Sequence, residues 1–91
     1  MTEIDVRPDA GGLAFDVVLR DQEGETRHRV TASSAALMQI KGTRALSPED
    51  AIRACFRFLL ARESKESILS RFDVSVIPNY FPEFEHEIGK Y

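Results

Sequence analysis

The chain of 91 residues has a single cysteine, no long apolar segment and no excess of basic residues. Its uninterrupted apolar runs, such as residues 58–61, are far shorter than the roughly 20 residues that a bilayer-spanning helix requires. Cys55 has no second cysteine with which to form an internal disulfide, which is typical of a reducing compartment. Residues 1–5 lack the basic start and the apolar stretch of a secretory signal. We therefore expect a cytoplasmic protein that does not enter a membrane.

Basic residues are too few to dominate the charge of the chain. It carries 12 Lys and Arg against 15 Asp and Glu, which gives a formal net charge of −3. Binding that depends on neutralising the phosphates of a nucleic acid usually requires a strongly basic surface. The composition therefore argues against a general nucleic-acid binder, and only a local basic patch would support that function.

The residue types that carry metal or catalytic chemistry are also few. His28 and His86 are the only histidines, and neither they nor Cys55 belong to a metal-binding pattern such as Cys-x-x-Cys or His-Glu-x-x-His. The pair Gly11-Gly12 lacks the further glycines of a phosphate-binding loop, and no Gly-x-Ser-x-Gly nucleophile motif is present. We therefore expect a non-enzymatic protein with no cofactor and no metal ion.

Apolar residues recur at every second position in the first third of the chain, which predicts β-strands. The alternation covers residues 3–7, 13–20 and 25–30, and the turn-forming residues of 8–12 and 21–24 separate these runs. Because the connections are short, we expect the three strands to form an antiparallel meander with one face toward a core. Arginines and acidic residues share its outer face, so cross-strand ion pairs are expected there.

Residues 47–50, Ser-Pro-Glu-Asp, carry the strongest helix signal in the chain. A serine can cap the first turn, proline suits the first helical position, and acidic residues favour the positive end of the helix dipole. This signal and the apolar spacing after it predict a long helix over about residues 48–62. Shorter helical elements are expected over residues 34–40, 65–72 and 82–88, with a kinked element between the last two.

The predicted fold is a single α+β domain over residues 1–91, in which the three-stranded antiparallel N-terminal meander packs on the long helix.

The predicted long helix is apolar on two sides. One arc contains Phe56 and Leu59 and is expected to face the sheet, and the opposite arc is centred on Phe58. A helix of this kind is usually covered on both sides. The second side is covered either by the later helices or by another subunit.

The aromatic residues near the chain end present the same choice, because they either pack onto the core or form a patch for a partner. The candidate partner-binding residues from these two regions are Phe58, Ala51, Ala54, Ala61, Tyr80 and Phe81.

Four basic residues in the helical half form the other candidate site. Arg53 and Arg57 lie one turn apart on the predicted long helix, and Lys65 and Arg71 follow it. These side chains either belong to a solvated helix face, where Glu49 precedes Arg53 at i,i+4 spacing, or contact phosphate or an acidic partner.

The segments RFLLARESKESIL (residues 57–69) and RFDVSVIPNYFPEF (residues 71–84) resemble a group of small, uncharacterised bacterial proteins with a strand-rich start and a helical end. The resemblance covers the second half of the chain closely and the first half loosely. It implies a matching fold and a bacterial cytoplasmic setting, and it implies no activity.

The sparse catalytic residues and the surplus of apolar helix surface favour one function. We expect a small non-enzymatic protein-interaction or regulatory module that binds a protein partner or a second copy of itself. The alternative is a nucleic-acid-binding protein that uses the basic residues of its helical C-terminal half.

Overall fold

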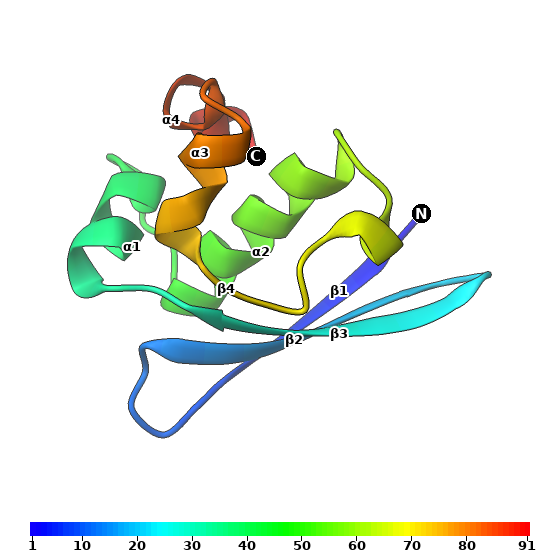
Figure 1. Ribbon diagram of the computed structural model, residues 1–91. Coiled ribbons are helices and arrows are strands. Elements are labelled where there is room, and N and C mark those ends of the chain that lie inside the picture. The colour runs from blue at the N-terminus through cyan, green and yellow to red at the C-terminus, as the bar shows by residue number, and fades with distance from the viewer.

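A four-stranded sheet forms one layer of the structure, and the helices lie on one face of it (Figure 1). The computed structural model describes all residues from 1 to 91. The strands are β1 (Glu3–Pro8), β2 (Ala14–Asp21), β3 (Gly24–Thr31) and β4 (Arg71–Asp73), in the spatial order β1-β2-β3-β4. The helices are α1 (Ser34–Lys41), α2 (Pro48–Leu60), α3 (Ile77–Tyr80) and α4 (Phe84–Glu87), and 3-10 turns cover Lys65–Ser67, Val74–Val76 and Ile88–Lys90. The expected α+β class, with a strand-rich N-terminal half and a helical C-terminal half, is confirmed.

The predicted antiparallel meander is present in β1, β2 and β3. Its inward side chains alternate along each strand as expected, and Phe15 and Val17 of β2 are fully buried. The turn between β2 and β3 is tight because the Asp21 carboxylate accepts the backbone N–H of Glu23 (2.8 Å) and Gly24 adopts a positive φ of 127°. The meander thus presents an apolar face to the helices.

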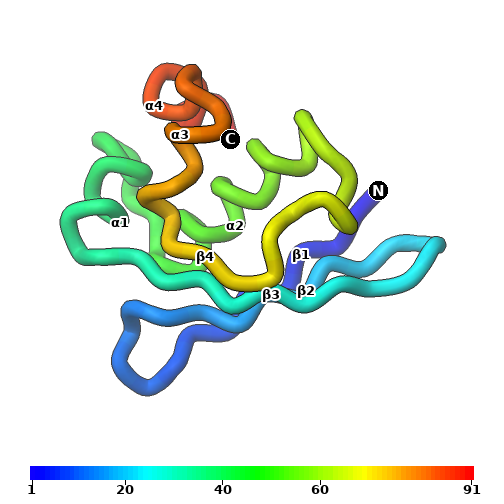
Figure 2. The backbone as a smooth tube through the Cα atoms, viewed as in Figure 1, coloured from blue at the N-terminus to red at the C-terminus, as the bar shows by residue number.

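The segment that follows α2 differs from the prediction. Residues 65–72 are not one helix, because only Lys65–Ser67 forms a 3-10 turn and Arg71–Asp73 forms β4, a fourth strand parallel to β3. The long helix is also shorter than predicted, since α2 ends at Leu60. In Figure 2 the chain after α2 descends from the helix layer to the sheet before it climbs again into α3.

The fourth strand is held by contacts that are distant in the sequence. Phe72 lies opposite Val30 in the register, and its ring packs on Phe56 of α2 with a centroid distance of 6.0 Å. The Thr31 hydroxyl donates to the Asp73 carboxylate (2.6 Å), and these two residues are 42 positions apart. Local periodicity carries no signal for such a pairing, which is why residues 65–72 resembled a helix.

Helix α2 lies between the sheet and the C-terminal helices, so both of its apolar sides are covered within the chain (Figure 1). On the sheet side, Phe56 packs on His28 of β3 at 5.5 Å between ring centroids. On the other side, Phe58 is fully buried. The rings of Phe81, Phe84 and Tyr91 meet it edge to face at centroid distances of 5.9, 5.0 and 5.6 Å.

Two arginines hold the C-terminal residues against the Phe58 side of α2. Arg62 places its guanidinium 3.7 Å from the centroid of the Phe58 ring and donates to the Glu83 carboxylate (2.9 Å) and the Tyr91 hydroxyl (3.2 Å). Arg44 donates to the backbone carbonyl of Tyr91 (3.2 Å). The aromatic cluster around Phe58 is therefore closed by hydrogen bonds at its edge.

Replacing Phe58 by alanine tests this interior role. We expect Phe58→Ala to lower the free energy of unfolding by about 3–5 kcal/mol, because it removes a fully buried ring and leaves a cavity among three aromatic neighbours. Chemical denaturation followed by circular dichroism measures the change. Tyr80→Ala is the control, since Tyr80 is 65% exposed and should change stability by less than about 0.5 kcal/mol. An unchanged denaturation midpoint for Phe58→Ala would contradict the interior role.

Candidate functional site

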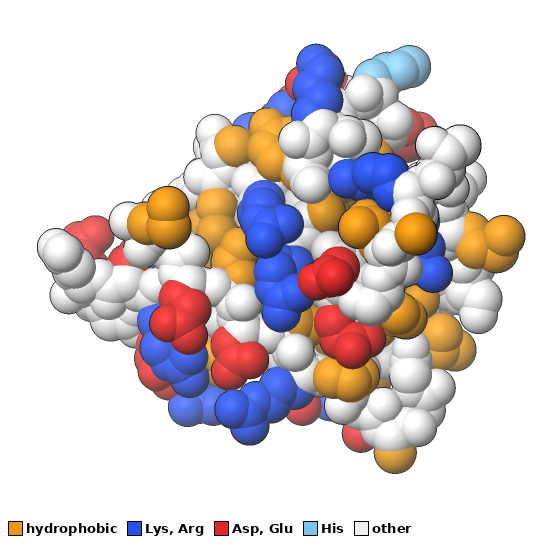
Figure 3. Space-filling view, turned by 180° about the vertical axis from the view of Figure 1, so that it is seen from behind, with side chains coloured by type: hydrophobic (Ala, Val, Ile, Leu, Met, Phe, Trp, Pro, Cys, Tyr) orange, Lys and Arg blue, Asp and Glu red, His pale blue; other side chains and the backbone are white.

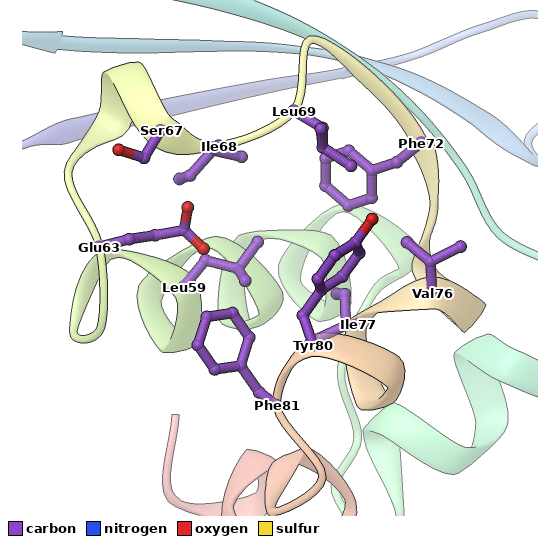
Figure 4. Close-up of a pocket in the computed structure, with 10 residues that line it drawn as sticks. All are labelled: Leu59, Glu63, Ser67, Ile68, Leu69, Phe72, Val76, Ile77, Tyr80 and Phe81. Carbon is purple, nitrogen blue, oxygen red and sulfur yellow. The ribbon is translucent and has the colours of Figure 1, made fainter.

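An open apolar groove lies where the end of α2, the segment before β4, and α3 meet (Figure 4). Its volume is about 150 Å³, which matches an engineered apolar cavity that holds one benzene ring. Eight of its ten lining residues are hydrophobic. The lining residues are Leu59, Glu63, Ser67, Ile68, Leu69, Phe72, Val76, Ile77, Tyr80 and Phe81.

One wall of the groove is positioned by a histidine of the sheet. His28 is buried, and its Nδ1 lies 2.7 Å from the backbone carbonyl of Leu69. Since a carbonyl oxygen only accepts, Nδ1 carries a proton, and Nε2 is hydrogen-bonded to the Thr26 hydroxyl at 2.8 Å. This arrangement ties Leu69 to β3, yet the Leu69 side chain stays 48% exposed at the edge of the groove.

The opposite wall comes from the short helix α3 and the residue after it. The Phe81 ring is anchored against Phe58 of the core, and Ile77 is buried. Tyr80 extends across the groove, with its hydroxyl toward Leu69 and Phe72 (Figure 4). The groove therefore has walls fixed by the core and two exposed hydrophobic side chains, Leu69 and Tyr80, at its opening.

The carboxylate of Glu63 is the one acidic group of the groove. Its side chain points from the end of α2 toward the space between Leu59 and Ile68 (Figure 4). It is partly buried and has no ion pair or side-chain hydrogen bond. Burial raises the pKa of Glu63.

The six candidate partner-binding residues lie in three different environments: the core, the exposed end of α2, and the apolar groove. Phe58, Ala51 and Ala54 are buried inside the chain, so they present no surface to a partner in this fold. Ala61 is exposed at the end of α2, outside the groove lining. Tyr80 and Phe81 both line the apolar groove.

The four candidate phosphate-contacting residues are not brought together. Arg53 bonds to Asp50 and to the carbonyl of Ile4 in β1 (3.4 Å), whereas Arg71 belongs to β4 at the opposite edge of the sheet. Arg57 and Arg71 are exposed and have no ion pair. Seen from behind in Figure 3, Lys and Arg side chains are interspersed with Asp and Glu, and no continuous basic surface covers that face.

Lys65, the fourth of these residues, is buried, with only 3% of its side chain exposed. Its ammonium group lies 2.9 Å from the Asp21 carboxylate and 2.5 Å from the Glu66 carboxylate. Two carboxylates thus neutralise the ammonium group of Lys65, which was predicted as a candidate contact for phosphate or an acidic partner.

The outer face of the sheet contains a broad polar hollow of about 530 Å³. The arginines around it are already paired with carboxylates, as the sequence predicted. Arg20 contacts Glu3 (3.1 Å) and Glu25 (3.2 Å), and Arg29 contacts Asp9 (2.6 Å) and Asp16 (3.0 Å). An anion in this hollow would have to displace these pairs, so the apolar groove is the better candidate site.

Only some of the residues that line the groove were predicted from the sequence. Tyr80 and Phe81 were candidates because of the aromatic end, but Leu69 and Phe72 fell within residues 65–72, which were predicted as a helix that does not form. Glu63 carried no signal, because one acidic residue after a helix is ordinary in composition and spacing.

No group of three or more His, Cys, Asp and Glu side chains is arranged to hold a metal ion. None of the helices combines the length and the apolar character that crossing a membrane requires. No protein-family model matches the chain, and no curated protein or solved structure shows significant similarity to it.

The single thiol is predicted to be inert in the folded protein. Cys55 is buried on α2, and burial raises its pKa to about 12, which lowers the thiolate fraction at pH 8 by about a thousandfold. We expect a disulfide reagent to label Cys55 rapidly in concentrated guanidinium and only at the rate of unfolding in native buffer. Complete labelling of native protein within the mixing time would show that the thiol is accessible.

The Lys65 ion pairs predict an acid-dependent loss of stability. The ammonium of Lys65 lowers the pKa of Asp21 and of Glu66, so the pairs stabilise the fold above the unfolded carboxyl pKa of about 4 and lose this effect as pH falls through the folded values. The pKa of Lys65 is raised, so its contribution is complete below about pH 10 and is lost above the raised value.

Thermal unfolding of Lys65→Met at several pH values measures this effect. We expect a lower melting temperature than wild type between about pH 5 and 9, and convergence of the two proteins only as pH falls through the lowered folded pKa values of Asp21 and Glu66. Lys90→Met is the matched control, because the Lys90 pair with Glu87 is solvent-exposed and should change the melting temperature little. A wild-type advantage that is constant down to pH 2 would contradict the assignment.

Proposed function

We propose that the protein is a small non-enzymatic protein-interaction or regulatory module whose working surface is the apolar groove. One observation supports this proposal above the others: a concave apolar site is preformed on the surface, with Leu69 and Tyr80 48% and 65% exposed at its opening. Large exposed apolar side chains around a concavity are typical of binding sites.

The groove suits a short segment of a partner protein. Its volume of about 150 Å³ holds one large apolar side chain. A stable interface between two globular surfaces buries about 800 Å² on each side, which is much more than one side chain in a groove contributes. The size of the site therefore favours a peptide with a single anchor over a second folded copy of the chain.

The walls of the groove are suited to binding without rearrangement. Phe81 and Ile77 are packed into the core, and the His28 hydrogen bond holds Leu69 in place. A preformed site spends less conformational entropy on binding. The two polar lining residues are Glu63 and Ser67, and the lining contains no histidine or cysteine, so we propose binding rather than catalysis for the groove.

The nucleic-acid alternative has weaker support. Of its four residues, Arg53 and Lys65 are bonded to acidic neighbours, and only Arg57 and Arg71 are unpaired. Two separated arginines on a protein with a net charge of −3 offer few phosphate contacts.

Selection from a displayed library of random heptapeptides tests the proposed function. We expect the immobilised protein to enrich peptides with one large apolar residue, because such a residue fits the groove. The double variant Leu69→Gln/Tyr80→Ser should bind these peptides about tenfold more weakly, as expected when an aromatic anchor site is lost. Isothermal titration calorimetry with the synthesised peptides measures the affinities.

Met38→Gln is the matched control for the double variant. Met38 is 70% exposed on α1 and is not among the residues that line the groove, so its replacement removes an exposed apolar side chain outside the site. The proposal fails if no enriched peptide distinguishes the double variant from Met38→Gln. Tight binding of a labelled single-stranded DNA that weakens steeply with salt would instead favour the nucleic-acid alternative.

A further inference from the structure

The charge inside the apolar groove narrows the class of peptide that it can accept. Glu63 points into the groove without an ion pair, whereas the cations on both sides of it in the sequence are occupied. Arg62 donates to Glu83 and stacks on Phe58, and Lys65 lies between Asp21 and Glu66. No cation of the chain pairs with Glu63.

Filling the groove with an uncharged segment would be unfavourable for this carboxylate. A bound apolar side chain displaces water from the groove and desolvates Glu63 further. Desolvation of an ionised carboxylate costs free energy unless a cation or hydrogen-bond donors replace the water. Glu63 is already partly buried in the groove, and this burial raises the pKa of its carboxyl group.

We infer that the groove recognises a peptide segment in which a large apolar side chain is adjacent to a lysine or arginine, with the apolar side chain between Leu69 and Tyr80 and the cation on Glu63. This inference rests on the proposed function and adds the chemistry of the partner. In Figure 4 Glu63 and Val76 lie at opposite ends of the groove, so the cation enters at the α2 end while the apolar group occupies the middle.

A set of capped peptides tests this chemistry directly. Each heptapeptide has a central phenylalanine in an alanine and glutamine background and carries one Lys, Gln or Glu, placed one or two positions before or after the phenylalanine. Titration of ¹⁵N-labelled protein reports affinity and location through the amide signals of residues 63, 69 and 80. We expect the best Lys peptide to bind about fivefold more tightly than its Gln counterpart, and the Glu peptide to bind more weakly than both.

The variant Glu63→Gln tests whether the Glu63 carboxylate causes the preference for the Lys peptide. It should bring the Lys, Gln and Glu peptides to within about twofold of one another, because the charge that distinguishes them is gone. Glu85→Gln is the matched control, since Glu85 is exposed, unpaired and outside the groove and its replacement changes the net charge equally. Glu85→Gln should preserve the preference for Lys.

The outcomes separate this inference from the proposed function. Equal binding of the Lys and Gln peptides at all four positions, with shifts confined to the groove, overturns the inference and leaves the proposed function in place. Preference for Lys that persists in Glu63→Gln also overturns it. If no phenylalanine peptide shifts the groove amides, the proposed function fails together with the inference.

Discussion

Helix α2 has to bury two faces at once, and the arrangement of the other elements follows from this requirement. A sheet can cover only one face of a helix, and here Phe56 occupies that face against His28 and Phe72. The opposite face carries Phe58, whose ring is too large and too apolar to be left in water at low cost. The chain therefore has to return over α2 after the sheet is complete, and α3, α4 and the last residues are that return.

The apolar groove is a by-product of this return. Between α2 and α3 the chain first descends to the sheet as β4 and then rises again (Figure 2). The two arms of this path diverge, and the space between them is lined by side chains from both. Phe81 turns toward Phe58 while its neighbour Tyr80 is left outside. A surface available for binding thus arises from the same packing that stabilises the interior.

The elements that were predictable from sequence are those whose signals are local. Alternation marked the meander, and Ser47 with Pro48 marked the start of α2, where the Ser47 hydroxyl accepts the N–H of Asp50 (3.1 Å). The fourth strand was missed because its partner Thr31 is 42 residues distant from Asp73. Its three residues could not show an alternation long enough to outweigh the helical spacing of Ile68, Leu69 and Phe72.

The candidate site was predictable only where it coincided with unusual composition. The aromatic end pointed to Tyr80 and Phe81, which do line the groove. Whether the two sides of α2 are covered by this chain or by another one is a question of tertiary structure, and helix periodicity is the same in both cases. For the same reason the sequence could not separate Lys65, which is buried between carboxylates, from Arg57 and Arg71, which are free.

The short parallel pairing of β4 also has a consequence for the order in which the protein assembles. The β2–β3 hairpin can form from neighbouring residues, whereas pairing β4 with β3 closes a loop that contains both α1 and α2, and the entropy cost of closing this loop favours a later step. With three paired residues, β4 is also the strand with the fewest backbone bonds to resist local opening. A molecule bound across the groove would join this late-forming strand to α3, so occupancy of the groove and completion of the fold are thermodynamically coupled.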